Sequence, residues 1–146
     1  MTAATRTTTA ELASLLRPAL LRLTRLVRNQ RVDMSVTLTQ LSAMGTLYKR
    51  GSMSAGELAA CERVQPPSMT KVLANLEERG LVVREVHPTD RRQAIIAITP
   101  AGVDLLDSER RSRDAWLTQQ LDNLSADERA LLQRVIPLLD KLAETK

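Results

Sequence analysis

Apolar residues recur every three or four positions along most of the chain, which is the spacing of one face of an α-helix. The first such stretch covers residues 11–31, where leucines stand at helical spacing from Leu12 to Leu26. Pro18 falls inside this stretch and predicts a kink or a later helix start, because proline has no backbone N–H. The Thr- and Ala-rich residues 1–10 lack this pattern and are predicted to form a mobile tail.

Capping boxes predict where three further helices begin, since each pairs a Ser or Thr with a Glu or Gln three positions later. The pairs are Thr37 with Gln40, Ser54 with Glu57, and Ser125 with Glu128. A further helix over residues 67–79 follows a Pro-Pro step and stops at Gly80, a residue suited to the position after a helix end. Another helix begins at Thr99-Pro100, where threonine can cap and proline fits the first turn.

The period changes to that of β-strands in only one part of the chain. Residues 81–86 and 94–98 are short and rich in Val and Ile, and the polar segment 87–93 between them opens with a proline step. This pattern predicts a β-hairpin with a long, charged tip. The sequence therefore predicts a mainly α fold with one small hairpin between helices.

The composition argues against enzymes, metalloproteins and membrane proteins. Cys61 and His87 are the only cysteine and histidine, so a cysteine metal site and a disulfide framework within one chain are excluded. A Ser-His-Asp enzyme would have to use His87, which is predicted on an exposed hairpin. We therefore expect no catalytic residues, metal or cofactor. The apolar runs are far shorter than the roughly 20 residues of a membrane helix, and no signal peptide is recognised, so a cytoplasmic location is expected.

Charge and aromatic content narrow the class of nucleic acid that could be a partner. Residues 1–50 carry eight Lys or Arg against two Asp or Glu, an excess that permits contact with nucleic acid. The chain has no Phe, one Tyr and one Trp, so it cannot build the aromatic platforms on which unstacked bases lie. A duplex is the expected form.

A short helix, a tight turn and a second helix are the arrangement that places a helix in the major groove of DNA. In the predicted helix 67–79, Ser68, Thr70, Lys71 and Asn75 lie away from the apolar side and suit phosphates and base edges. The Pro66-Pro67 step leaves the N-terminus of this helix open toward an anion. The two arginines of the hairpin tip suit the narrow minor groove. Each feature alone is also compatible with a solvated surface, and for the hairpin tip taken alone a charged, soluble turn is the preferred interpretation.

Together these motifs resemble those of the multiple-antibiotic-resistance-regulator (MarR) family. The resemblance runs from residue 37 to residue 102 and rests on a set of motifs at the family's spacing: Thr37-x-x-Gln40, Ser54-x-x-Glu57-Leu58, Pro67-Ser68-Met69-Thr70-Lys71, Leu76-Glu77-Glu78-Arg79-Gly80-Leu81-Val82, Asp90-Arg91-Arg92 and Ile98-Thr99-Pro100-Ala101-Gly102. It implies a winged helix-turn-helix domain over residues 37–99. It also implies N- and C-terminal dimerisation helices over residues 11–36 and 100–146.

The resemblance further implies a homodimer on a palindromic operator, with half-sites about 34 Å apart. Arg92 would enter the minor groove, Asp90 would orient it, Arg91 would lie nearer phosphate, and Ser54 would approach the backbone. The residues expected at the major groove are Gln65, Pro66, Pro67, Ser68, Thr70, Lys71 and Asn75. Repression, relieved by a small phenolic or anionic ligand, is the expected regulation. The alternative is a winged-helix module that binds proteins without reading DNA sequence.

Overall fold

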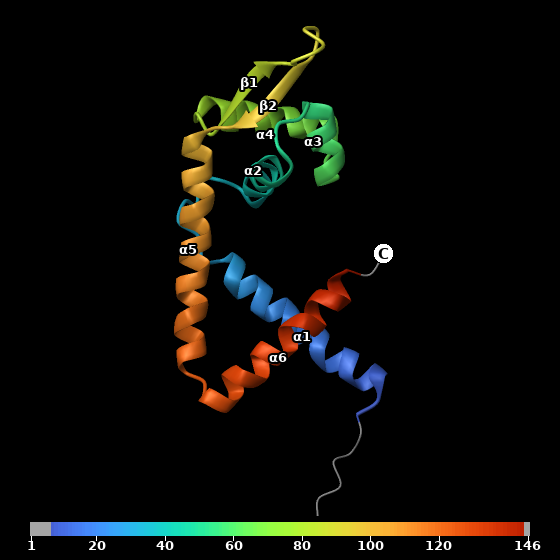
Figure 1. The fold of residues 1–146 in the computed structure, drawn as a ribbon, viewed down its shortest axis with the longest axis vertical. Helices are drawn as coiled ribbons and strands as arrows, with labels where there is room; N and C mark the ends of the chain where they lie inside the picture. Colours follow the sequence, from blue (N-terminus) through green and yellow to red (C-terminus); the bar gives the residue numbers. More distant parts are fainter. Residues whose placement is uncertain (1–6, 145–146) are drawn as a thin grey trace, which may run out of the picture. The chain divides into compact units, whose positions relative to one another are not determined.

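The computed structural model describes residues 7–144, which divide into two compact units (Figure 1). One unit is Arg31–Arg111, called the winged unit below. The other comprises the chain up to Gln30 and from Ser112 onward, called the terminal unit. The boundaries differ from the predicted domains, since the segments 31–36 and 100–111 belong with the winged unit.

The winged unit contains three helices, a hairpin and the start of a fourth helix. In chain order these are α2 (Leu38–Arg50), α3 (Ala55–Glu62), α4 (Pro66–Glu78), β1 (Val82–Val86), β2 (Ala94–Ile98) and the first part of α5 (Pro100–Asp122). The two strands are antiparallel, with Val82 opposite Ile98 and Val86 opposite Ala94. The hairpin and its long tip agree with the sequence prediction, except that β1 begins at Val82, one residue later than predicted.

One apolar core holds the winged unit together. The apolar side of every helix from α2 to α4 faces inward, and Leu81, Val82 and Ile96 close the core from the hairpin. The hairpin is also fastened to the chain before α3, since the backbone amides and carbonyls of Met53 and Ile96 bond to each other at 3.2 and 2.7 Å. The buried helical residues are Leu41, Ala43, Met44, Leu47, Leu58, Ala59, Met69, Leu73 and Leu76.

The capping boxes predicted at Thr37, Ser54 and Ser125 all form, with both reciprocal hydrogen bonds present in each. Gly80, with φ +69°, adopts the left-handed conformation expected after α4. A fourth box was not predicted. The Thr8 hydroxyl accepts the Glu11 N–H at 3.2 Å, and the Thr8 N–H donates to the Glu11 carboxylate at 2.7 Å.

The fourth box corrects the predicted tail of residues 1–10, because α1 (Thr9–Arg28) begins within it. Residues 1–6 lie outside the described part. The terminal unit also contains α6 (Ala126–Ala143) and the second part of α5. Both α1 and α6 continue past an internal proline, Pro18 and Pro137. No residue of Thr9–Arg28 or Ala126–Ala143 is buried. Among residues 7–144, no helix combines the length and apolar character needed to cross a membrane.

Candidate nucleic-acid interface

The first turn of α4 is shaped by two prolines. Gln65 is the extended residue before the helix, and its side chain makes no capping bond, so Pro66 begins the helix. The amides of Ser68 and Met69 both donate to the Gln65 carbonyl, at 2.9 and 3.0 Å. Since prolines have no N–H, these bonds leave no free backbone donor in the first turn. The expected opening toward an anion is therefore limited to the helix dipole, without direct amide contacts.

The outward side of α4 is polar and available for contacts. Gln65, Ser68 and Lys71 are exposed, and within residues 7–144 their side chains make no hydrogen bond or ion pair. The exposed Thr70 hydroxyl donates to the Pro66 carbonyl at 3.0 Å, so it can still accept a hydrogen bond. Because the apolar side of the helix is buried in the core, these side chains share the remaining face. That face can present an amide, two hydroxyls and one cation to a partner.

Asn75 is set apart from the other predicted α4 residues. Its amide oxygen accepts a hydrogen bond from the side chain of Gln40, on α2, at 2.8 Å. The Gln40 amide oxygen in turn accepts the Thr37 N–H at 2.8 Å. Asn75 thus joins α4 to the capped start of α2, while its side chain stays exposed and its amide N–H groups can still donate.

The hairpin tip holds its arginines in an ordered turn. The Asp90 carboxylate accepts the backbone N–H of Arg92 at 3.1 Å and the Nε–H of its guanidinium at 3.3 Å. The Arg92 side chain nevertheless remains 92 % exposed. Arg91 is exposed and, within the described chain, has no ion pair. The orienting contact from Asp90 to Arg92, which the resemblance implied, is present in the structure.

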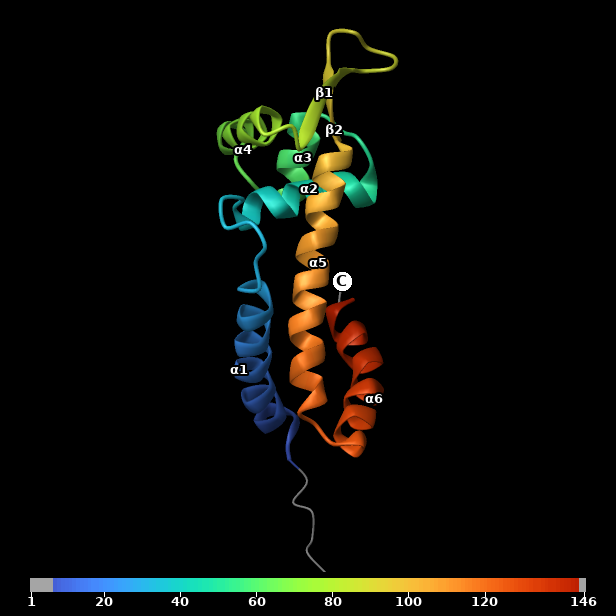
Figure 2. The ribbon, with the colours of Figure 1, turned by 90° about the vertical axis from the view of Figure 1, so that its left-hand side faces the viewer.

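The position of the hairpin relative to α4 can be followed in both ribbon views (Figures 1 and 2). Within the winged unit, α4 and the hairpin lie on the same side of α2, and the tip between β1 and β2 projects beyond the helices. The exposed side of α4 and the two arginines are therefore both accessible on one unit. A groove-reading helix with a neighbouring arm requires this arrangement.

Ser54 has a more internal environment than the other predicted contacts. It is half-buried, and its hydroxyl accepts the Glu57 N–H at 3.1 Å. The pKa of the Glu57 carboxyl is lowered, first by the backbone N–H of Ser54 and next by its hydroxyl. The Ser54 hydroxyl is thus already engaged with Glu57, and it would have to turn away from that carboxylate to donate to a phosphate. The Glu57 carboxylate at the same helix end would oppose a nearby phosphate.

Sequence reasoning missed the contacts that fix the far end of α4. Arg79, the residue that follows the helix directly, pairs with Asp33 at 2.7 Å. The pKa of Asp33 is lowered to about 2, first by the Ser35 hydroxyl and next by the Arg79 guanidinium. The segment carrying Asp33 is itself held by buried Glu109 of α5, whose carboxylate accepts the N–H groups of Val32 and Asp33 at 3.2 and 3.1 Å. No local motif signals these contacts, because the partners are 46 to 77 positions apart.

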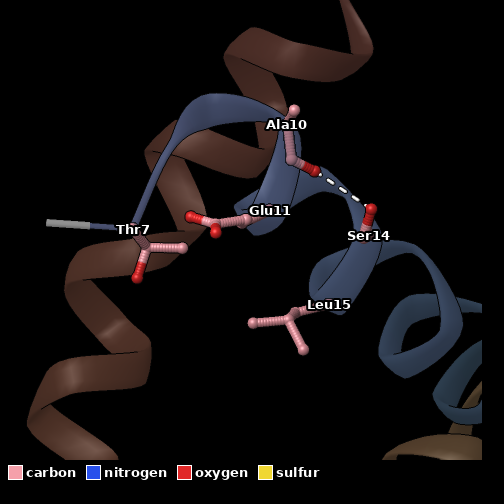
Figure 3. A pocket seen from close by; sticks show the side chains of 5 residues that line it. All are labelled: Thr7, Ala10, Glu11, Ser14 and Leu15. Carbon is pink, nitrogen blue, oxygen red and sulfur yellow. Dashed lines mark hydrogen bonds between the residues drawn. The ribbon is translucent and has the colours of Figure 1, made fainter. Parts of the chain in front are cut away.

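A recess on the first turns of α1 lacks the positive charge that an anionic ligand would require. Thr7, Ala10, Glu11, Ser14 and Leu15 line it (Figure 3), and the Ser14 hydroxyl donates to the Ala10 carbonyl at 3.0 Å. The Glu11 carboxylate is engaged in the capping box, and the lining residues include no cation. This recess therefore does not fit an anionic ligand.

Comparisons with known proteins agree with this geometry. The MarR family profile matches residues 36–94. An HTH-type transcriptional regulator of Mycobacterium leprae is 42% identical over 135 residues, which cover 92% of this chain and 94% of that protein. A crystal structure of a transcriptional regulator from Pseudomonas aeruginosa has a TM-score of 0.83 and 32% identity, covering 94% and 96% of the two chains.

A more distant structure, a mutant of S. aureus MepR bound to an oligodeoxyribonucleotide, shares the fold. It has a TM-score of 0.71 at 21% identity, and the match covers 89% of this chain and 96% of that one. The long match to the mycobacterial regulator and the family profile over the winged unit together decide the family. The chain belongs to the MarR family of DNA-binding, HTH-type transcriptional regulators and is not an enzyme.

Proposed function

We propose that two copies of this chain bind one inverted-repeat duplex and repress transcription from it. The observation that carries the proposal is the pairing of an exposed polar side of α4 with an exposed, oriented Arg92 on the same unit. A DNA-binding regulator acts where the chromosome is, so we place its action in the cytoplasm.

Gln65, Ser68, Thr70 and Lys71 are the proposed major-groove contacts. A helix fits into the major groove, which is about 12 Å wide, whereas the minor groove of about 6 Å admits only side chains. Pro66 and Pro67 would place these side chains by fixing the start of the helix. Asn75 is proposed as a further contact, made through its exposed amide N–H groups because its amide oxygen is bonded to Gln40. The DNA-bound MepR structure supports a DNA role for this fold.

Arg92 is the proposed minor-groove contact. Asp90 restricts its guanidinium before binding, which lowers the entropy lost when the side chain is ordered in the groove. Arg91 is proposed to meet a phosphate, as is the hydroxyl of Ser54. Contacts to phosphate position the protein, whereas those to base edges give sequence preference.

The terminal unit supports the proposal of a homodimer. Leucine and isoleucine side chains on α1 and α6 remain exposed, although leaving apolar area in water costs roughly 25 cal/mol per Å². Those more than half exposed include Leu12, Leu15, Leu21, Leu131, Ile136 and Leu138. A second copy would cover both helices and give two winged units for the two halves of a symmetric operator.

Relief by a small phenolic or anionic ligand completes the proposed regulation. Such a ligand would act by binding more tightly to a form of the dimer that fits DNA poorly. The recess on α1 does not support an anionic ligand at that position. Repression would follow from occupation of the promoter by the dimer.

The decisive experiment is a binding titration with the duplex upstream of the chain's own gene, compared with a scrambled duplex of equal length. We expect selective binding of the native duplex that weakens steeply between about 50 and 200 mM salt, because phosphate contacts release counterions. Lys71→Ala should cost about 1–3 kcal/mol of binding free energy. Lys49→Ala, which removes an equal charge from the exposed end of α2, is the matched control.

Equal affinity for both duplexes at every salt concentration would overturn the proposal. It would favour the alternative, a winged-helix module that binds proteins. Full affinity of Lys71→Ala with a selective wild type would instead contradict the placement of α4 at the major groove.

A further inference from the structure

His87, the one histidine of the chain, stands where β1 passes into the hairpin tip. Its backbone N–H donates to the Gln93 carbonyl at 3.0 Å, so it closes the ladder before the turn. Its half-buried side chain points back into the turn and has no role in the proposed DNA contacts. The polar groups around this imidazole indicate that the side chain has a role in the turn.

The Nδ1 atom of His87 is surrounded by donors. It lies 3.2 Å from the backbone nitrogen of Thr89 and 3.1 Å from that of Asp90, with the Thr89 hydroxyl at 3.2 Å. A backbone N–H can only donate, so Nδ1 must be an unprotonated acceptor and the ring proton must be on Nε2. An imidazolium carries hydrogens on both nitrogens and cannot accept either bond.

The same turn positions the minor-groove arginine. His87 holds the backbone of Asp90, and the Asp90 carboxylate holds both the amide and the guanidinium of Arg92. We propose that neutral His87 is a positioning residue for the hairpin tip, and that its protonation releases the turn and weakens DNA binding. This inference rests on the proposed role of Arg92 at DNA.

The charged groups near the imidazole come from two elements. Glu57 on α3 interacts electrostatically with His87 and favours the imidazolium. Asp90 lies in the turn itself, with its carboxylate bonded to Arg92. Arg91 and Arg92 of the tip oppose the imidazolium. Protonation therefore gains attraction to Glu57 and loses the two hydrogen bonds that Nδ1 accepts from the turn.

The direction of the pH dependence separates this role from a simple phosphate contact. An imidazolium touching a phosphate would strengthen binding as the pH falls, since DNA attracts the added charge. Release of the turn predicts the opposite sign. Histidine is the side chain whose charge ordinarily changes between about pH 5 and 8, so this range is the informative one.

The test measures affinity for the native duplex at about pH 8 and pH 5.5 for wild type, His87→Asn and His87→Ala. An asparagine oxygen can accept the same turn N–H groups and does not titrate. We expect the wild type to bind about fivefold more weakly at the lower pH, the value of roughly one net hydrogen bond. His87→Asn should bind like the wild type at pH 8 and lose that dependence, and His87→Ala should be weak at both pH values.

Wild-type binding that tightens on acidification, relative to His87→Asn, would overturn the inference, as would full affinity of His87→Ala. Nitrogen NMR of the free protein gives a readout without DNA, because only one imidazole is present. The Nε2–H tautomer at pH 8 is expected, with the amide signals of Thr89 and Asp90 moving as the ring titrates. An Nδ1–H tautomer would overturn the inference. If the proposed DNA interface were wrong but the role of His87 right, Lys71→Ala would bind DNA normally and the Nε2–H tautomer would still be observed. The two failures can therefore be distinguished.

Discussion

The winged unit and the helices α1 and α6 use similar leucine-rich patterns with opposite results. In the winged unit, α2, α3 and α4 each bury apolar side chains in a common core. Neither α1 nor α6 buries any residue, although each carries an apolar side. The winged unit therefore contains the partners of its own apolar surface, whereas the two terminal helices require another surface. The proposed second copy of the chain would supply that surface.

The largest expected effect is on the free energy of unfolding. It is tested by making the same substitution, Leu to Ala, once in the winged unit and once on α1. Leu73→Ala, in the buried side of α4, should lower the free energy of unfolding by about 2–5 kcal/mol, because it leaves a cavity in a packed core. Leu15→Ala, at a side chain that is 67 % exposed on α1, removes the same atoms. It should leave the unfolding of the winged unit unchanged in urea denaturation. Equal losses for the two variants would contradict the comparison.

A smaller effect is expected on self-association. Leu15→Lys and Ile136→Lys place charges on the exposed apolar sides of α1 and α6, where Ile136 is 55 % exposed. Each lost apolar contact should weaken the dimer by about 1.5–3 kcal/mol per side chain, measured by sedimentation equilibrium. Val86→Lys, at a 66 % exposed side chain of the hairpin, is the control and should keep the dimer mass. Dimers of unchanged strength in all three variants would rule out these helices as the interface.

Local signals in the sequence predicted much of the winged unit and the start of α6. The capping boxes at Thr37, Ser54 and Ser125 need only a spacing of three, and they form because both partners lie in one helical turn. The Thr8-Glu11 pair has the same spacing and could have been found, but its composition suggested a tail. Asp90 and Arg92 are also near neighbours, so their contact followed from the motif.

Contacts between distant positions could not be predicted in this way. Gln40 reaches Asn75 across 35 positions, and this bond leaves the amide N–H groups of Asn75 for the proposed contact with DNA. Glu109 binds the backbone of Val32 and Asp33 from 76 or 77 positions away. Neither end of these contacts has a local pattern that specifies the other, because the fold alone brings them together. Sequence therefore identified the outward side of α4 better than the contacts that hold it.

The smallest expected effect concerns one of those contacts, between Asp33 and Arg79. The folded protein holds the pKa of Asp33 at about 2, mainly through the Ser35 hydroxyl and then the Arg79 guanidinium. An unfolded aspartate titrates near 3.9, so the folded pKa is the lower one. The stability that it contributes is then fully present above about pH 4 and is lost as the pH falls toward 2.

Asp33→Asn should accordingly be less stable than the wild type at pH 6, and the difference in unfolding free energy should narrow from about pH 4 downward. Asp104→Asn is the matched control, since the Asp104 carboxylate makes no hydrogen bond or ion pair within residues 7–144. Its difference from the wild type should show no such narrowing in urea titrations at the same pH values. A difference for Asp33→Asn that stays constant down to about pH 2 would show that the contact does not depend on the charge of the carboxylate. The end of α4 would then be held by hydrogen bonds that an asparagine can also make, together with the apolar core and the bond between Gln40 and Asn75.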